Sequence, residues 1–229
     1  MEFGSPEFWA ALMQIMLINI VLSGDNAVVI ALASRNLPPA MQKKAIFWGS
    51  AAAIILRIIL TVFAVALLDM NWIKLGGAVL LLWIGVKLLV PEDGHGDLEG
   101  ASNLMGAVKT ILIADFVMSL DNVIAVAAAA KGSMTLLIIG LGVSIPLIIF
   151  GSAMLLKVMD RFPIIITIGG ALLGYVAGDM AVHDGAIGGF IQANQWLVDY
   201  KVAPIAGAVF VVALGKYLAS KKPAAQAAH

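Results

Sequence analysis

The stretch SGDNAVVIALASR (residues 23–35) places an Asp-Asn pair inside a segment that is otherwise apolar enough for a membrane helix. A second stretch, SLDNVIAVAAAAK (residues 119–131), repeats the pair 96 positions later. A charged side chain inside a bilayer costs several kcal/mol, so ionisable residues are rarely kept there without a function. The repeated acid therefore indicates both a membrane fold and a functional site within it.

The composition of the whole chain agrees with a membrane protein. Of its 229 residues, 62% are hydrophobic and 12% are charged, whereas soluble domains carry about 25% charged residues. The formal net charge of zero argues against a nucleic-acid partner, and the absence of cysteine excludes disulfides and thiolate metal sites. We therefore predict an all-α polytopic protein of the cell (inner or plasma) membrane, without an organic cofactor.

Hydropathy predicts seven transmembrane helices in a single domain that covers residues 8–218. The two longer connectors are residues 91–103 and 181–201. The predicted helices are residues 8–33, 45–68, 72–90, 104–130, 134–158, 163–180 and 202–218.

Basic residues in short loops predict the orientation of the chain, because the side richer in Lys and Arg normally faces the cytoplasm. One side of the predicted helices has only Lys74, Lys131 and Lys201. We therefore predict an N-terminus outside and a cytoplasmic C-terminus. The basic side collects Arg35, Lys43, Lys44, Lys87, Lys157, Arg161, Lys216, Lys221 and Lys222.

The chain also carries an internal repeat, in which residues 8–90 resemble residues 104–180. Each unit has three predicted crossings, so the second unit enters the membrane from the opposite side. The sequence therefore predicts two inverted three-helix repeats plus a seventh helix, an arrangement typical of secondary transporters. At the offset of 96, Asn19 matches Asp115, Ser23 matches Ser119, Asp25 matches Asp121 and Asn26 matches Asn122.

Each motif helix has one polar face, because residues three, four or seven apart share a face at about 100° per residue. Two such faces, opposed, would form a pocket of carboxylate, amide and hydroxyl oxygens. We expect Gly24 to let the first helix loosen at this point, whereas Leu120 gives the second helix no such freedom. The faces comprise Asn19, Ser23 and Asn26 with flanking Asp25, and Asp115, Met118, Ser119 and Asn122 with flanking Asp121.

Charge balance favours a divalent cation as the ligand of this pocket. Asp25, Asp115 and Asp121 bring three negative charges into a low dielectric, and Arg57 supplies one positive charge nearby. One divalent ion would neutralise the remainder, and protons would compete with it because desolvated carboxylates take up protons. Oxygen ligands suit Mg²⁺, Ca²⁺ and Mn²⁺, and a thioether from Met118 would favour Mn²⁺ among these. Two simpler interpretations stay open: Arg57 only ties helices together, and Met118 only packs the core.

The stretches NIVLSGDNAVVIALASRNLP (residues 19–38) and ADFVMSLDNVIAVAAAAKG (residues 114–132) closely resemble the TerC family of bacterial integral membrane proteins. The resemblance covers residues 8–218 and is greatest to the short, YjbE-like members. It implies manganese export and metal homeostasis, with the motif residues lining the ion path. Transport direction and manganese as the cargo come from this resemblance more than from charge. The implicated residues are Asp25, Asn26, Asp115, Asp121 and Asn122.

Together these patterns predict a transporter rather than an enzyme: secondary-active export of Mn²⁺ or a similar divalent cation by alternating access, with protons as counter-ions. Its predicted partners are the cation, protons and the lipid bilayer, and a homo-oligomer is left open. One rival is an exporter of an amino acid or another small organic solute, for which Arg57 would bind a carboxylate. Another is an intramembrane aspartyl protease, but LSGD lacks the first glycine of the Gly-x-Gly-Asp signature and a third acid disturbs the dyad.

Two loops carry acids and histidine. The loop PEDGHGDLEG (residues 91–100), which contains His95, is interpreted as a solvated acidic loop because its glycines leave it too flexible for a preformed site. The outer segment GDMAVHDG (residues 178–185), with Asp179, His183 and Asp184, is a weak candidate for metal binding on exit.

Overall fold

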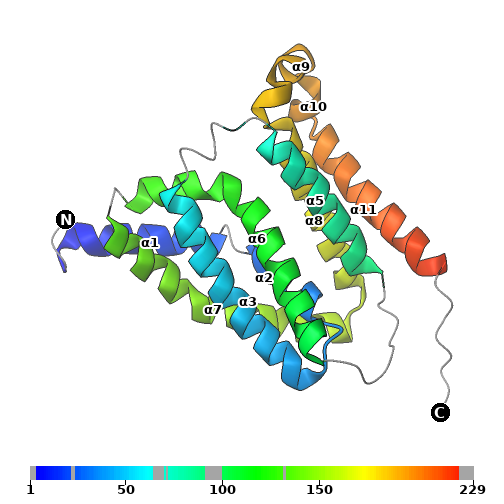
Figure 1. Ribbon diagram of the computed structural model, residues 1–229. Helices are drawn as coiled ribbons and strands as arrows, with labels where there is room; N and C mark the ends of the chain where they lie inside the picture. The colour runs from blue at the N-terminus through cyan, green and yellow to red at the C-terminus, as the bar shows by residue number, and fades with distance from the viewer. Residues whose placement is uncertain are drawn as a thin grey trace.

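A computed structural model describes residues 4–21, 24–63, 70, 72–90, 100–130 and 133–221, with the side chains at 20, 21, 100–102, 121, 124 and 127 outside the description. Within these ranges every regular element is a helix (Figure 1), which confirms the all-α prediction. The helices are α1 (Pro6–Val21), α2 (Gly24–Ser34), α3 (Pro39–Val62), α5 (Ile73–Leu89), α6 (Gly100–Ala130), α7 (Met134–Arg161), α8 (Ile164–Val182), η1 (Gly185–Ile187), α9 (Gly188–Ala193), α10 (Trp196–Asp199) and α11 (Val202–Lys221).

Several of these helices are long and apolar enough to cross a membrane. Five qualify on their own, namely α3, the Asn103–Leu120 part of α6, α7, α8 and α11. The bent pair α1 and α2 would make a sixth, whereas α5 has only 17 residues. The described residues therefore form a multi-pass membrane protein with five or six candidate spans, and the predicted count of seven is not reached by these helices.

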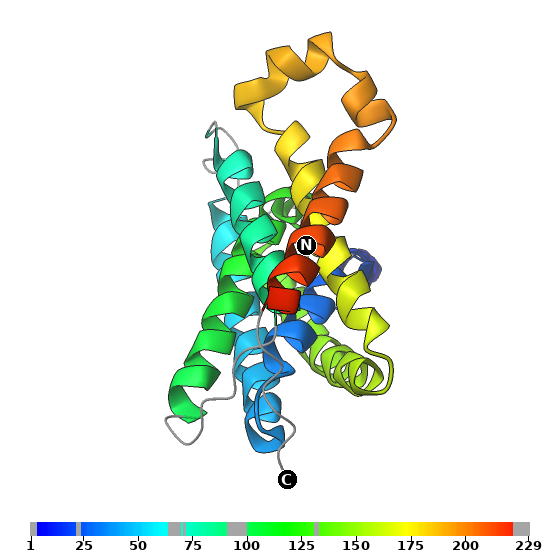
Figure 2. The same cartoon turned by 90° about the vertical axis from the view of Figure 1, so that its right-hand side faces the viewer.

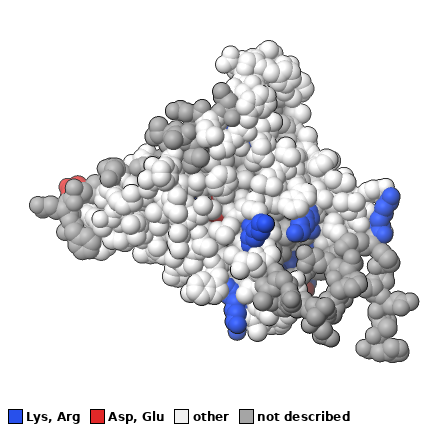
Figure 3. Space-filling model, viewed as in Figure 1, with Lys and Arg blue, Asp and Glu red and all other residues white. Residues whose placement is uncertain are grey.

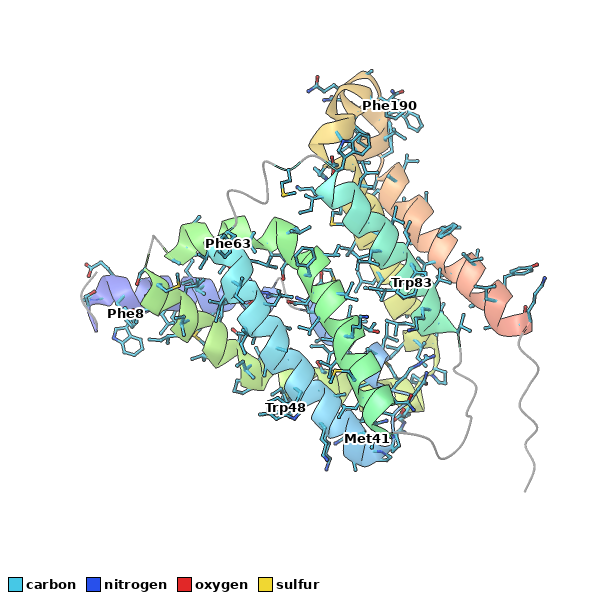
Figure 4. All side chains as sticks on the ribbon, in the orientation of Figure 1. Phe8, Met41, Trp48, Phe63, Trp83 and Phe190 are labelled. Atoms are coloured by element: carbon cyan, nitrogen blue, oxygen red, sulfur yellow. The ribbon has the colours of Figure 1, made fainter. Side chains whose placement is uncertain are left out.

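The outer surface of the bundle is apolar, as expected of a surface that faces lipid. Trp48 on α3 is 60% exposed and points away from the helices (Figure 4), and Phe150 on α7 is 69% exposed. A soluble protein rarely exposes so many large apolar side chains. The exposed apolar surface therefore agrees with helices that have lipid rather than water around them.

The first predicted span is broken at the Asp-Asn motif. Helix α1 ends at Val21 and α2 begins at Gly24, and the two axes differ by 48°. Residues 22 and 23, between the two helices, lie outside the described residues, and Gly24 is the first residue of α2, so its effect on the helix stays a prediction. Helix α6 instead continues through Leu120 to Ala130, although Figure 1 shows it turning aside over its last turns.

The helices pack in two groups. Helix α3 packs chiefly against α6 and α7, and α1 and α2 contact the same two helices. Helices α5, α8 and α11 form the second group, and Figure 2 shows α8 and α11 side by side. Helices α3 and α5 of the first predicted repeat thus pack on different partners, so the helices of the two predicted repeats interleave instead of forming two separate bodies.

Small residues hold α8 and α11 close together. A Cβ atom at Gly174 would collide with the carbonyl oxygen of Gly207, and one at Gly207 would collide with the carbonyl oxygen of Gly174. One turn along α8, a Cβ at Gly178 would collide with the carbonyl of Ala203. Glycines four residues apart let membrane helices approach to backbone contact, and this spacing accounts for the close packing of α8 on α11.

Basic side chains gather at one end of the bundle. Figure 3 shows Lys and Arg over the lower and right-hand part of one face, with none over the upper end in that view. Arg35, Asp160 and Lys216 line one open cleft of about 450 Å³, so the ends of α2, α7 and α11 lie together. Lys201 lies near the C-terminal end of α8, away from this cleft, and its Nζ is 3.3 Å from Asp179 Oδ1. The structure thus places these basic residues as the loop assignment expects.

Candidate cation site

Arg57 lies in the apolar run IILRIIL of α3 and is 2% exposed. Thr61, one turn later, donates a 2.7 Å hydrogen bond to the Arg57 carbonyl oxygen. The apolar neighbours along α3 leave the guanidinium to find its counter-charge on other helices. A charge buried in this way is tolerated only when it is paired and hydrogen-bonded.

The guanidinium is held by three side chains from two other helices. Its Nη2 donates to Asp115 Oδ1 on α6 at 2.7 Å, and its Nη1 donates to Asn19 Oδ1 on α1 at 2.6 Å. Its Nε donates to Ser119 Oγ at 3.2 Å. Arg57, Asp115, Asn19 and Ser119, here called the Arg57 cluster, therefore tie α1, α3 and α6 together.

Asp115 is engaged through both carboxylate oxygens. Oδ1 accepts from Arg57, and Oδ2 accepts from Ser119 Oγ at 3.4 Å. The residue is 5% exposed, and Ser119 is fully buried. Ser119 lies one turn after Asp115 on α6, so helical spacing alone brings these two side chains together.

The first Asp-Asn pair lies beside the Arg57 cluster, at the start of α2. Asp25 is partly exposed, and its Oδ1 accepts a 2.8 Å hydrogen bond from the Asn26 backbone N–H. Asp25 is close enough to Arg57 and Asp115 to interact with both electrostatically. Asn26 is 4% exposed. The structure thus brings carboxylate and amide oxygens from α2 next to an ion pair between α3 and α6.

Two of the remaining predicted site residues have side chains outside the described part of the chain. Ser23 lies outside the described residues, and so does the side chain of Asp121, although its backbone belongs to α6. Asn122 is half-buried on α6. Met118 is 4% exposed and packs in the main apolar cluster, which agrees with the simpler interpretation of this residue as core. Among the described side chains, no three acids or histidines lie close enough to hold a metal ion by themselves.

One member of the network was not anticipated from the sequence. Thr61 stabilises the turn of α3 that carries Arg57, through its bond to the Arg57 carbonyl. The signal for it is a threonine four residues after an arginine in an otherwise apolar helix, because a threonine hydroxyl often bonds the carbonyl one turn back.

In the outer segment, residues 178–185, Asp184 binds backbone N–H groups and thus has a structural role. Asp184 is 2% exposed, and its carboxylate accepts from the backbone N–H groups of Trp72 and Leu75, both at 3.0 Å, and of Ala186 at 2.7 Å. It therefore caps the start of α5 from the turn that follows α8. Burial raises the pKa of this carboxyl, but backbone hydrogen bonds, including one from Lys74, outweigh burial and lower the pKa.

Among the described residues of the outer segment, Asp179 and His183 form no metal-binding group with a third acid or histidine. The Asp179 carboxylate contacts Lys201, and His183 Nδ1 lies 3.9 Å from Asp179 Oδ2. His95 and the rest of its acidic loop, residues 91–99, lie outside the described residues.

The chain is similar to known integral membrane proteins. A family model described as "Integral membrane protein TerC family" matches residues 4–223. The chain is 39% identical to the uncharacterized membrane protein YjbE of Bacillus subtilis, over 92% of this chain and 96% of that protein. It is 26% identical to YceF of the same organism, over 77% of this chain and 72% of YceF, and 26% identical to the inner membrane protein YgdQ of Escherichia coli, over 69% and 74%. No solved structure matches.

Proposed function

Because this chain belongs to the TerC family of integral membrane proteins, we propose that it is a secondary transporter of the cell membrane that exports Mn²⁺ or a similar divalent cation. Membership in the family confirms the resemblance seen in the two Asp-Asn stretches, and it is consistent with a membrane transporter rather than an enzyme. The cargo, its direction and the mechanism belong to the proposal.

The observation that carries the proposal is the buried Arg57–Asp115 ion pair, 2.7 Å from nitrogen to oxygen, inside a bundle of apolar helices. Ionisable residues in such surroundings are costly, and membrane proteins keep them chiefly on ion and substrate pathways. Asp25 and Asn26 beside the pair add oxygen ligands of the kind that hard divalent cations prefer. In the proposal, Asp121 and Asn122 supply the equivalent groups from α6.

A polar cleft suggests the route from the basic, proposed cytoplasmic end. A cavity of about 100 Å³ between α2, α5 and α6 has Asn36, Asn103 and Thr110 in its lining. On α6 the buried residues Ile111 and Ala114 separate Thr110 from Asp115. We propose that the ion enters by this cleft and reaches the acids when the apolar segment between them moves aside.

Alternating access then requires one part of the bundle to move against another. Helices α5, α8 and α11 pack mainly against one another, and helices α1, α2, α3, α6 and α7 do the same. We propose that the boundary between these two groups moves, with α5 counted as a seventh span and the N-terminus outside. The ion displaces protons from the acids on entry, and protons return when it leaves on the other side.

The test is uptake of Mn²⁺ into liposomes that contain the purified protein, with Mg²⁺, Ca²⁺ and Zn²⁺ as competitors. Saturable uptake that prefers Mn²⁺ in the wild type, and falls at least about 100-fold in Asp25→Asn because a nearby charge is removed, supports the proposal. Asp199→Asn, at an exposed position of α10, is the matched control. Full uptake by Asp25→Asn, or no uptake by the wild type, refutes the assignment.

The geometry weighs against both rivals. An organic carboxylate could use Arg57 only by replacing Asp115, which already holds it at 2.7 Å. An aspartyl protease needs two acids that share a proton, and a carboxylate paired with an always-charged guanidinium does not keep one. Neither rival is favoured by a specific contact in the described residues.

A further inference from the structure

Arg57 and Asp115, the two charged members of the Arg57 cluster, are hydrogen-bonded to each other and to neighbouring side chains. Each kind of guanidinium nitrogen has an acceptor, at 2.7, 2.6 and 3.2 Å, and both oxygens of Asp115 have donors. Arg57 and Asp115 are 2% and 5% exposed. A buried pair satisfied in this way is strongly destabilised when one partner is withdrawn.

Ligation of a cation by Asp115 would require just such a withdrawal. The cation would have to draw the carboxylate from Arg57 and leave the guanidinium buried without its counter-charge. A guanidinium stays protonated at every physiological pH, so proton loss cannot relieve this cost. Asp115 is therefore poorly suited to bind and release a cation in each transport cycle.

We infer that Arg57 and Asp115 form a fixed neutral pair that sets the charge of the site, and that Asp115 is a specificity-determining residue rather than a ligand. This inference rests on the proposed function. Of the three motif acids, Asp115 is then cancelled by Arg57. In the proposed function the other two motif acids, Asp25 and Asp121, supply the ion site, and their two negative charges match one divalent ion. By setting the net charge of the site to −2, the pair disfavours monovalent ions, which leave one negative charge uncompensated, and trivalent ions, which add one positive charge too many.

Charge variants separate a charge-setting pair from a ligand. Asp115→Asn leaves Arg57 in place and reduces the net charge of the site to −1, so Mn²⁺ affinity should fall at least about 100-fold. Arg57→Gln raises it to −3, so La³⁺ should compete at least about 10-fold better against Mn²⁺ than in the wild type. The double variant R57Q/D115N restores −2, and its Mn²⁺ affinity should recover at least about 10-fold over Asp115→Asn.

The measurement is Mn²⁺ binding to the purified full chain in lipid nanodiscs, followed by the electron paramagnetic resonance signal of free Mn²⁺, with and without La³⁺. Thermal unfolding of each variant checks that it is folded. The matched control removes another ion pair, Lys201 with Asp179, which is exposed and lies 3.3 Å apart. The double variant Lys201→Gln with Asp179→Asn should bind Mn²⁺ as the wild type does.

The outcomes are distinguishable. No Mn²⁺ binding by the folded wild type refutes the proposed function, and the inference falls with it. Mn²⁺ binding by the wild type but no recovery in folded R57Q/D115N shows that Asp115 is a ligand and overturns the inference alone. If the variants that replace Arg57 or Asp115 by an uncharged residue fail to fold, Arg57→Lys is the deciding variant, because it keeps the positive charge. An unchanged ratio of Mn²⁺ to La³⁺ affinity in Arg57→Lys supports the inference. A shift of this ratio by more than about 10-fold toward La³⁺ contradicts it.

Discussion

The cap on helix α5 yields a prediction with a magnitude. Asp184 accepts hydrogen bonds from backbone N–H groups, among them those of Trp72 and Leu75 at 3.0 Å and of Ala186 at 2.7 Å. Asp184→Asn keeps one acceptor oxygen but loses the charge and the second oxygen. Loss of one charge-assisted bond costs about 1.5–3 kcal/mol, and loss of a negative charge at a helix start costs about 0.3–1 kcal/mol.

We therefore expect Asp184→Asn to lower the free energy of unfolding by about 2–4 kcal/mol. At about 2–4 °C per kcal/mol for a chain of this size, the Tm should fall by roughly 5–15 °C. The assay is thermal unfolding in detergent, followed by circular dichroism. Asp160→Asn, an exposed acid at the end of α7, is the control.

The same contact predicts a pH dependence. Because the hydrogen bonds lower the folded pKa of Asp184, its contribution to stability is present above the ordinary aspartate pKa of about 3.9. The contribution is lost as the pH falls through the lower, folded pKa. The gap in Tm between wild type and Asp184→Asn should stay constant from about pH 5 to 8 and shrink below about pH 4. A variant that melts with the wild type at neutral pH would refute the capping role.

Three further predictions follow from other contacts. Asp25→Asn should reduce Mn²⁺ uptake at least about 100-fold with little change in Tm. A variant that unfolds, or that stays folded and keeps full uptake, would contradict a role of Asp25 as a ligand. Gly174→Ala should destabilise the bundle by about 2–4 kcal/mol in chemical denaturation, because its Cβ meets the Gly207 carbonyl, whereas Gly106→Ala, with no neighbour within 4 Å, should be neutral or stabilising. In this cysteine-free chain, single cysteines at Lys216 and Asp199 should react with a membrane-impermeant thiol reagent from opposite sides, the first from the cytoplasm; labelling from one side would overturn the proposed orientation.

Much of the fold could be predicted from local sequence. Helix α7 extends three residues beyond the predicted 134–158, to Arg161, and α11 lies within three residues of the predicted 202–218. Long apolar runs form helices in lipid because every backbone polar group must be bonded within the segment. The number of membrane spans was harder to predict from the sequence, because α1 and α2 form a bent pair of helices and α5 has only 17 residues.

The candidate site was foreseen as a set of residues and not as a set of contacts. Asn19, Arg57, Asp115 and Ser119 were all candidates from their polar character in apolar helices, and the structure brings the four together. Helical spacing indicated which residues share a face, but not which acid takes the arginine. Met118 shares the polar face by spacing and nevertheless packs in the apolar cluster.

The sequence by itself determined the membrane environment, the helical segments and the polar residues that must find partners, because these follow from hydropathy and local spacing. Only the tertiary structure decided that Asp115 pairs with Arg57, that Asp184 caps α5, and that α5 packs with α8 and α11. The physical reason is that apolar helices attract one another weakly in lipid and with little preference. Their partners are chosen by close approach at small residues and by the few buried polar groups, and both depend on segments far apart in the chain.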